Sequence, residues 1–160
     1  MSYSGSGIVR LQFGRGNQPK CPWSREVTWQ ECNRWPRHLE QLRRGLHEYL
    51  CGQPVNPAQW EWELDAADWS PFRIQVTRAL RRIKRGQVVT YGELATKCGS
   101  PDASRAVGHV MATNPVPLLV PCHRVVGRHG VGGFSAPGGV AIKLWLLELE
   151  GADPYAGGKS

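Results

Sequence analysis

Residues 90–114 read Thr90-Tyr-Gly-Glu-Leu-Ala-Thr-Lys-Cys-Gly-Ser-Pro-Asp-Ala-Ser-Arg-Ala-Val-Gly-His-Val-Met-Ala-Thr-Asn114 and predict two short helices joined by a turn. Thr90 and Glu93 have the spacing of a capping box, in which each side chain accepts a hydrogen bond from a backbone N–H at a helix start. The first helix is expected to stop at Gly99. A second is expected to open at Ser100-Pro101 and to end at Asn114, before a proline. This arrangement is typical of a helix-turn-helix.

The second predicted helix has two different sides. Its apolar side is formed by Ala103, Ala106, Val107, Val110 and Met111. The opposite side carries Arg105, Gly108, His109 and Ala112. Small side chains with one long cation suit a helix that enters a nucleic-acid groove. An ordinary surface helix rich in alanine and glycine is the alternative.

The stretch that follows ends in Pro-Cys-His-Arg-Val125 and contains a candidate nucleophile, Cys122. A thiolate is a strong nucleophile, and an adjacent base or cation makes it available near neutral pH. Packing in the core is the common alternative for an unpaired cysteine. Leu118–Val120 is expected to be a buried strand. Neighbours on a strand point to opposite faces, so the side chains of Cys122 and His123 cannot simply touch. They can interact only if the backbone turns sharply at Pro121-Cys122 or if a water bridges them.

The rest of the chain predicts further elements around this region. They are a strand at 8–13, a helix at 38–50, a helix that Ser70 caps and that runs from Pro71 to Lys84, a short extended segment at 87–89, another at 125–126, a glycine-rich loop at 132–139 and an apolar helix at 140–150 capped by Gly151. An acidic connector at 60–65 suggests a boundary between two domains, 1–68 and 69–160.

Composition favours an intracellular globular protein. The chain has 160 residues, 41% of them hydrophobic, and seven tryptophans, enough for one domain or two small ones. Five cysteines without regular spacing argue against a secreted disulfide framework, so a cytoplasmic location is expected. There is no 18-residue apolar run, so no membrane association is expected. The cysteines and histidines of the first half lack zinc spacing, and no metal is predicted.

The net charge of +7 lies entirely in residues 69–160, because residues 1–68 carry equal numbers of acidic and basic side chains. A solvated basic face is the ordinary explanation. Confinement of the charge to one half favours a polyanion partner, of which nucleic acid is the usual one.

Six blocks between residues 70 and 151 resemble, in order and spacing, the O6-alkylguanine-DNA alkyltransferases, DNA-repair proteins that move an alkyl group from guanine onto their own cysteine. The blocks are Ser-Pro-Phe72, Val-Val-Thr-Tyr-Gly-Glu-Leu-Ala95, Ser-Arg-Ala-Val-Gly108, Asn-Pro-Val-Pro117, Pro-Cys-His-Arg-Val125 and Lys143 through Leu-Glu-Gly151. His109 and Phe134 depart from the family pattern, where a small residue and a tyrosine are common.

The resemblance implies a role for each matching residue. Cys122 would accept the alkyl group, and His123 would relay the thiol proton through a water to Glu150. Tyr91 would polarise the guanine, and Asn114 would order the site.

The resemblance also implies a set of DNA contacts. Arg105 would enter the duplex in place of the flipped guanine. Ala106, Gly108, Arg124 and Ser135 are expected to contact DNA as well. Extruding a base costs roughly a few kcal/mol in lost stacking and pairing, so a residue that fills the gap is useful.

The implied fold class is α+β, with a small RNase H-like α/β domain at 1–68 and a mostly helical winged helix-turn-helix domain at 69–160. A monomer without cofactor is expected to act once on double-stranded DNA that contains O6-alkylguanine, because nothing in the chain could cleave the thioether product. One alternative is a non-enzymatic binder of alkylated DNA, which Cys122 disfavours. The other is a helix-turn-helix transcription regulator, which sequence-specific binding would reveal.

Overall fold

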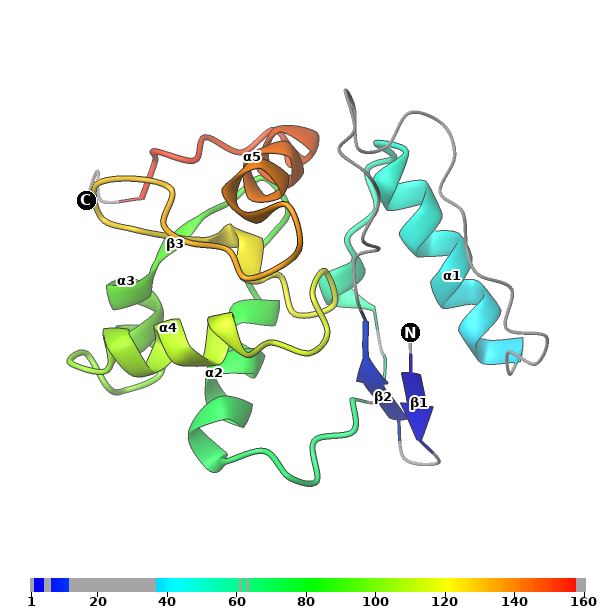
Figure 1. Cartoon of the computed structure of the whole chain (residues 1–160), viewed down its shortest axis with the longest axis horizontal. Coiled ribbons are helices and arrows are strands. Elements are labelled where there is room, and N and C mark those ends of the chain that lie inside the picture. The colour runs from blue at the N-terminus through cyan, green and yellow to red at the C-terminus, as the bar shows by residue number, and fades with distance from the viewer. Residues whose placement is uncertain (1, 5–6, 12–36, 61, 63, 158–160) are drawn as a thin grey trace.

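The computed structural model describes residues 2–4, 7–11, 37–60, 62 and 64–157. The elements, in chain order, are β1 (Ser2–Ser4), β2 (Gly7–Arg10), α1 (Arg37–Leu50), η1 (Pro57–Gln59), α2 (Pro71–Arg81), β3 (Val89–Thr90), α3 (Tyr91–Lys97), α4 (Ser104–Ala112), η2 (Cys122–Arg124), β4 (Val125–Val126) and α5 (Gly139–Glu150). Figure 1 shows α2 to α5 grouped on one side, with α1 and the β1–β2 hairpin on the other. The protein is therefore of the α+β class.

Local sequence signals set the start and end of several helices. Ser70 Oγ accepts a hydrogen bond from the Arg73 backbone N–H at the start of α2. At the start of α3, Thr90 Oγ1 accepts from Glu93 N at 3.1 Å, and Glu93 Oε2 accepts from Thr90 N at 2.7 Å. The predicted capping box is confirmed. Gly151 ends α5 in a left-handed conformation, also as predicted.

Helices α3 and α4 pack against each other and are joined by the turn 98–103. The second helix begins at Ser104, so the predicted start at Ser100-Pro101 is wrong. Those two residues belong to the turn, in which the Ala103 N–H donates to the Ser100 carbonyl at 2.9 Å. Ala106 is exposed, which corrects its assignment to the apolar side, whereas Val107, Val110 and Met111 are buried.

The predicted strand at 118–120 is also wrong. Leu118 has a φ of 73°, and the Val120 N–H donates to the Val116 carbonyl at 3.0 Å, so the chain turns here. Pro117 and Pro121 flank the segment and have no N–H to donate, so a strand ladder could not continue past it on either side. The three residues are buried, as predicted.

A two-stranded parallel pair brings the end of this turn back to α3. β3 pairs with β4 in the register Val89–Val125 and Thr90–Val126. Because the two strands are parallel, Tyr91, which follows β3, and η2, which precedes β4, continue from opposite ends of this two-residue pair.

The first half of the chain packs on the second through a shared core. Ile8, Leu46 and Tyr49 belong to one hydrophobic cluster with Leu80 and Leu146. The residue directly after β2 reaches across as well, since the Leu11 N–H donates to the Pro115 carbonyl at 2.8 Å. The domain division at residue 68 and the RNase H-like and winged details remain predictions, since residues 12–36 lie outside those that the structure describes.

Within the described residues, no helix combines the length and the apolar character needed to cross a membrane.

Gly138→Ala is expected to lower the free energy of unfolding by about 1–3 kcal/mol. Gly138 has a φ of 89°, and an added Cβ would lie 2.4 Å from Ile142 Cγ1. The matched control is Gly92→Ala in α3, where a Cβ meets nothing within 4 Å; it is expected to stabilise by up to about 1 kcal/mol. Urea denaturation measures both, and equal stabilities would contradict the strain at Gly138.

Candidate active site around Cys122

Cys122 begins the single-turn helix η2, directly after Pro121. The Arg124 N–H donates to the Pro121 carbonyl at 2.9 Å, so the backbone turns sharply between the end of the buried segment and β4. Of the two alternatives that the sequence left open, the structure has the sharp turn at Pro121-Cys122. Both residues lie in this turn and not in a strand, and their side chains point into different surroundings.

The Cys122 thiol lines a pocket of about 330 Å³ that four parts of the chain form together. The lining residues are Tyr91 from α3, Gly108, Met111 and Ala112 from α4, Cys122 from η2, and Gly133, Phe134 and Ser135 from the glycine-rich loop. Cys122 is only 7% exposed. The structure thus brings together four of the predicted catalytic and DNA-binding residues, namely Tyr91, Gly108, Cys122 and Ser135.

Asn114 fixes the thiol from a second direction. Its Nδ2 donates to Cys122 Sγ at 3.1 Å and to the Val120 carbonyl at 2.8 Å, while its Oδ1 accepts from the Val116 N–H at 3.1 Å. With its donor and acceptor both used, the amide cannot rotate freely. Asn114 therefore both orders the turn 114–122 and orients the sulfur.

Glu150 lies in a buried polar cluster behind the thiol. Its Oε1 accepts from Arg124 Nη2 at 2.7 Å and lies 3.0 Å from His123 Nε2. Its Oε2 accepts from Arg124 Nε at 2.8 Å. His123 and Arg124 are 1% and 0% exposed. A charge-assisted bidentate pair of this kind holds the carboxylate in one plane.

Arg124 is therefore not a DNA contact, which corrects the sequence-based assignment. Its remaining nitrogens donate to the Ile83 carbonyl at 2.7 Å and to Asn56 Oδ1 at 2.9 Å. A guanidinium with these partners cannot reach a phosphate without leaving a buried carboxylate unpaired.

The surroundings set the protonation states of the cluster. Burial alone would raise the pKa of Glu150, but hydrogen bonds and charge from His123 and Arg124 hold it well below its usual range, so Glu150 is ionised. Burial lowers the pKa of His123, so its ring is neutral near pH 7. Burial raises the pKa of the Cys122 thiol, although Asn114 and the charge of Lys143 offset part of the shift.

The two ring nitrogens of His123 have different roles. A neutral imidazole beside an ionised carboxylate carries its proton on the nitrogen that faces the oxygen, so Nε2 donates to Glu150. Nδ1 is buried and has no hydrogen-bond partner among the described residues. Its lone pair is therefore available as a base.

Tyr91 faces the thiol across the pocket. Burial and the nearby Cys122 raise the pKa of its phenol, so it keeps its proton and can donate a hydrogen bond to a group in the pocket.

Three residues of the cluster were not predicted as site residues. Lys143 is buried, and its Nζ donates to the Val125 carbonyl at 2.6 Å and the Gly133 carbonyl at 3.2 Å. Burial lowers the pKa of Lys143 to about 8. A single lysine within an apolar helix is a sequence signal that could have identified it. Tyr49 and Asn56, from the first half, gave no such signal.

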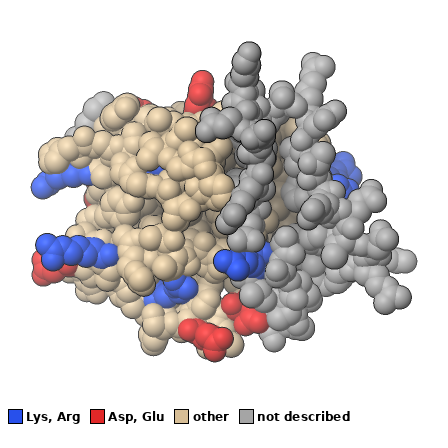
Figure 2. All heavy atoms as spheres, in the orientation of Figure 1, with Lys and Arg blue, Asp and Glu red and all other residues tan. Residues whose placement is uncertain are grey.

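The exposed surface of α4 continues outward from the pocket. Arg105, Ala106, His109 and Ala112 are exposed, and Gly108 is half-buried at the pocket wall. A Cβ at Gly108 would meet nothing within 4 Å, so a close partner could approach the backbone there. Figure 2 shows the lysines and arginines of one face lying apart from one another, some close to carboxylates.

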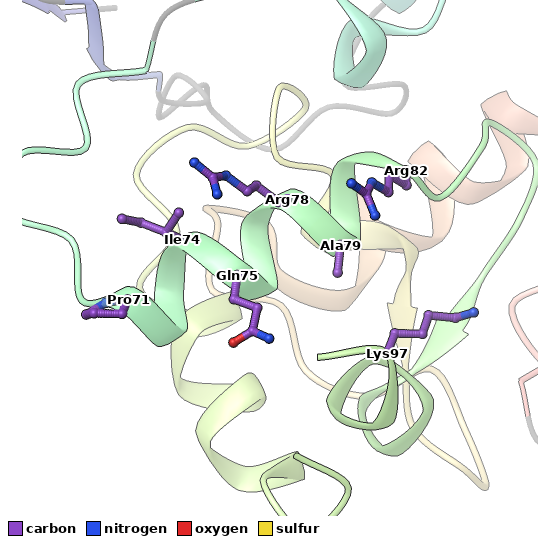
Figure 3. A pocket seen from close by; sticks show the side chains of 7 residues that line it. All are labelled: Pro71, Ile74, Gln75, Arg78, Ala79, Arg82 and Lys97. Atoms are coloured by element: carbon purple, nitrogen blue, oxygen red, sulfur yellow. The ribbon is translucent and has the colours of Figure 1, made fainter. Parts of the chain in front are cut away.

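A separate groove of about 630 Å³ runs along α2. Figure 3 shows Arg78 of α2, Arg82 directly after α2 and Lys97 of α3 among its lining side chains. Neither a thiol nor a carboxylate lines this groove, so it has cations but lacks the chemistry of the Cys122 pocket.

Across the part of the chain that the structure describes, no three His, Cys, Asp or Glu side chains converge on a point that could hold a metal ion. Cys21 and Cys32 lie outside that part, so the absence of a metal stays a prediction.

Known proteins match the second half of the chain. The protein family described as "6-O-methylguanine DNA methyltransferase, DNA binding domain" matches residues 71–152. The methylated-DNA–protein-cysteine methyltransferase of Salmonella typhimurium is 49% identical over 87 residues, a match that covers 54% of this chain but only 50% of that protein.

Two solved structures extend the comparison. Mycobacterium tuberculosis OGT in complex with DNA superimposes with a TM-score of 0.62 at 36% identity, over 70% of this chain and 66% of that one. A variant of the M. tuberculosis O6-methylguanine methyltransferase gives a TM-score of 0.62 at 29% identity, over 92% of this chain and 82% of that one. The matched domain, residues 71–152, contains the whole pocket and most of the polar cluster behind it. The chain therefore belongs to the 6-O-methylguanine DNA methyltransferase family.

Proposed function

We propose that the protein repairs DNA by moving the alkyl group of O6-alkylguanine onto its own Cys122. The observation that carries this proposal is a thiol at the wall of a small pocket, oriented by Asn114 and backed by the His123–Glu150 pair. A nucleophile, a base and an orienting carboxylate in this order are the parts that nucleophilic catalysis requires.

The transfer balances without a cofactor. Cys122 Sγ forms a bond to the alkyl carbon while the bond between that carbon and guanine O6 breaks. His123 accepts the thiol proton, and its Nδ1 is the available base. The departing guanine keeps the electron pair of the broken bond and takes up a proton from water. The Tyr91 phenol, which lines the pocket, stabilises the negative charge that develops on the guanine by donating a hydrogen bond. The thioether product is stable, so each molecule acts once.

DNA reaches this pocket along α4. We interpret α3 and α4 as a helix-turn-helix whose exposed face, Arg105, Ala106, His109 and Ala112, enters the minor groove of double-stranded DNA. Gly108 and Ala112 also line the pocket, so a guanine turned out of the duplex beside α4 would lie next to the thiol. Ser135 belongs to the loop that would close over the base.

The central test is mass measurement after incubation with a duplex that contains O6-methylguanine. The wild-type protein is expected to gain one methyl group, on Cys122, and no more than one per molecule. Cys122→Ala is expected to abolish transfer and leave DNA affinity nearly unchanged, because the side chain contacts no phosphate. Exposed Cys51 provides the control, since Cys51→Ala should retain transfer. Methyl on another cysteine, or more than one turnover, would overturn the mechanism.

Arg105→Ala is expected to slow repair of a duplex far more than repair of a short single strand. The reason is that Arg105 would fill the gap left by the flipped guanine, and a single strand has no such gap. Single-turnover transfer rates on the two substrates measure the effect. Arg44→Ala is the control, because this side chain is 80% exposed on α1, away from α4. Equal slowing on both substrates would contradict this role of Arg105.

Glu150→Gln is expected to slow alkylation of Cys122 at least about tenfold, because an amide stabilises a protonated His123 less than a carboxylate does. It is also expected to lower the free energy of unfolding by about 3–5 kcal/mol, since buried Arg124 loses its counter-charge. An unchanged rate of thiol alkylation by iodoacetamide in the variant would refute the relay.

The same variant predicts a difference in pH dependence. The pKa of Glu150 is lower in the folded protein than in the unfolded chain, so its stabilising contribution is complete above the unfolded pKa and is lost as pH falls. From about pH 5 downward, the stability of the wild type should therefore fall more steeply than that of Glu150→Gln. Urea denaturation at several pH values provides the measurement, and parallel curves would contradict it.

A further inference from the structure

Tyr49, from the first half of the chain, reaches the polar cluster behind Cys122. It lies in the last turn of α1 and is 0% exposed. Its hydroxyl donates to Glu150 Oε1 at 2.6 Å and lies 3.5 Å from His123 Nε2. The short distance to an ionised carboxylate is that of a charge-assisted O–H···O⁻ bond.

Packing of the first half fixes the position of this hydroxyl. Leu42 and Leu46 lie on the same buried side of α1 as Tyr49. The Arg85 guanidinium lies 5.5 Å from the centre of the Tyr49 ring, and it donates to the Leu149 carbonyl at 2.6 Å and the Val55 carbonyl at 3.1 Å. Arg85 therefore ties the loop after α1 to the end of α5, next to Glu150.

The donors around Glu150 are unequally distributed. Oε2 accepts from Arg124 alone, whereas Oε1 faces three donors, Tyr49, His123 and Arg124. Two of these residues belong to η2, so among the described residues Tyr49 is the one that holds the carboxylate from outside the thiol-bearing turn. Burial raises the pKa of Tyr49, so the phenol keeps its proton and is the donor.

We propose that Tyr49 is a positioning residue for the alkyl transfer, which acts by holding Glu150 against His123 and by sharing the negative charge of Oε1. This inference rests on the proposed function and extends it, because it gives the first half of the chain a part in the reactivity of Cys122.

The sign of the expected effect follows from the charges around His123. Glu150 and Lys143 of α5, Arg124 and Cys122 of η2, and Tyr49 of α1 surround the ring, with Arg85 beyond the phenol. Without the phenol, Oε1 keeps more of its charge toward His123, which favours the imidazolium form. The pKa of His123 therefore rises. A protonated His123 cannot accept the thiol proton, so the low-pH limb of the transfer rate moves to higher pH.

The experiment compares the wild type, Tyr49→Phe and the control Tyr155→Phe, which removes a phenol that is 61% exposed. Single-turnover methyl transfer from duplex O6-methylguanine is measured across pH, with duplex affinity measured separately. Tyr49→Phe is expected to transfer about tenfold more slowly than the wild type near pH 6, and at least as fast as the wild type near pH 8, at unchanged duplex affinity. NMR titration of the His123 ring should show its pKa rising in Tyr49→Phe and unchanged in Tyr155→Phe.

Several outcomes would overturn the inference. They are an unchanged rate and an unchanged pKa of His123, a loss confined to duplex affinity, or a rate loss that is the same at all pH values. Because the NMR signal of His123 comes from the folded molecules, a modest loss of stability does not obscure the titration.

A double-mutant cycle tests the route through Glu150. In the Glu150→Gln background, Tyr49→Phe should lower the methyl-transfer rate by less than about twofold, because the negative charge of Glu150 that the phenol shares has been removed. If the rate losses of the two single variants multiply in the double variant, Tyr49 does not act through Glu150. If the wild type transfers no methyl group, the proposed function fails, whereas the titration of His123 still tests Tyr49.

Discussion

The buried carboxylate of Glu150 is the constraint on which the rest of the site depends. It lies at the end of α5, where the helix dipole disfavours a negative charge, and it is removed from water. Such a charge is tolerable only with close donors, and it has them in Tyr49, His123 and Arg124. Satisfying this one group fixes the conformation of η2, and with it the direction of the Cys122 thiol.

The same arrangement keeps the thiol in its neutral form at rest. Burial raises the pKa of Cys122 and lowers that of His123, so the uncharged pair is favoured over the ion pair. A neutral thiol is a poor nucleophile toward adventitious reagents. Under the proposed function, in which Cys122 is used once, low resting reactivity is an advantage, provided that bound substrate and the lone pair of His123 Nδ1 make the proton transfer possible when it is needed.

The parts of this structure that the sequence predicts are those encoded by neighbouring residues. The capping box of Thr90 and Glu93 and the Ser70 cap each link residues three positions apart, and both are present. The predicted strand at 118–120 failed because alternating prolines and a left-handed Leu118 override an apolar run. Arg124 was misassigned because a basic residue beside a DNA-repair motif suggests a phosphate contact. Its true partner, Glu150, lies 26 residues away, and no local pattern records such a pairing.

Tyr49 is the extreme case, since 101 residues separate it from Glu150. Its apolar neighbours on α1 predict a buried ring but give no reason for a hydroxyl at its tip. A buried phenol without an acceptor would cost roughly 1–3 kcal/mol relative to phenylalanine. The hydroxyl therefore needs a buried acceptor, and the Glu150 carboxylate at the end of α5 is that acceptor. Because that carboxylate also orients His123, packing of α1 against α5 and reactivity of Cys122 are two consequences of the same contact.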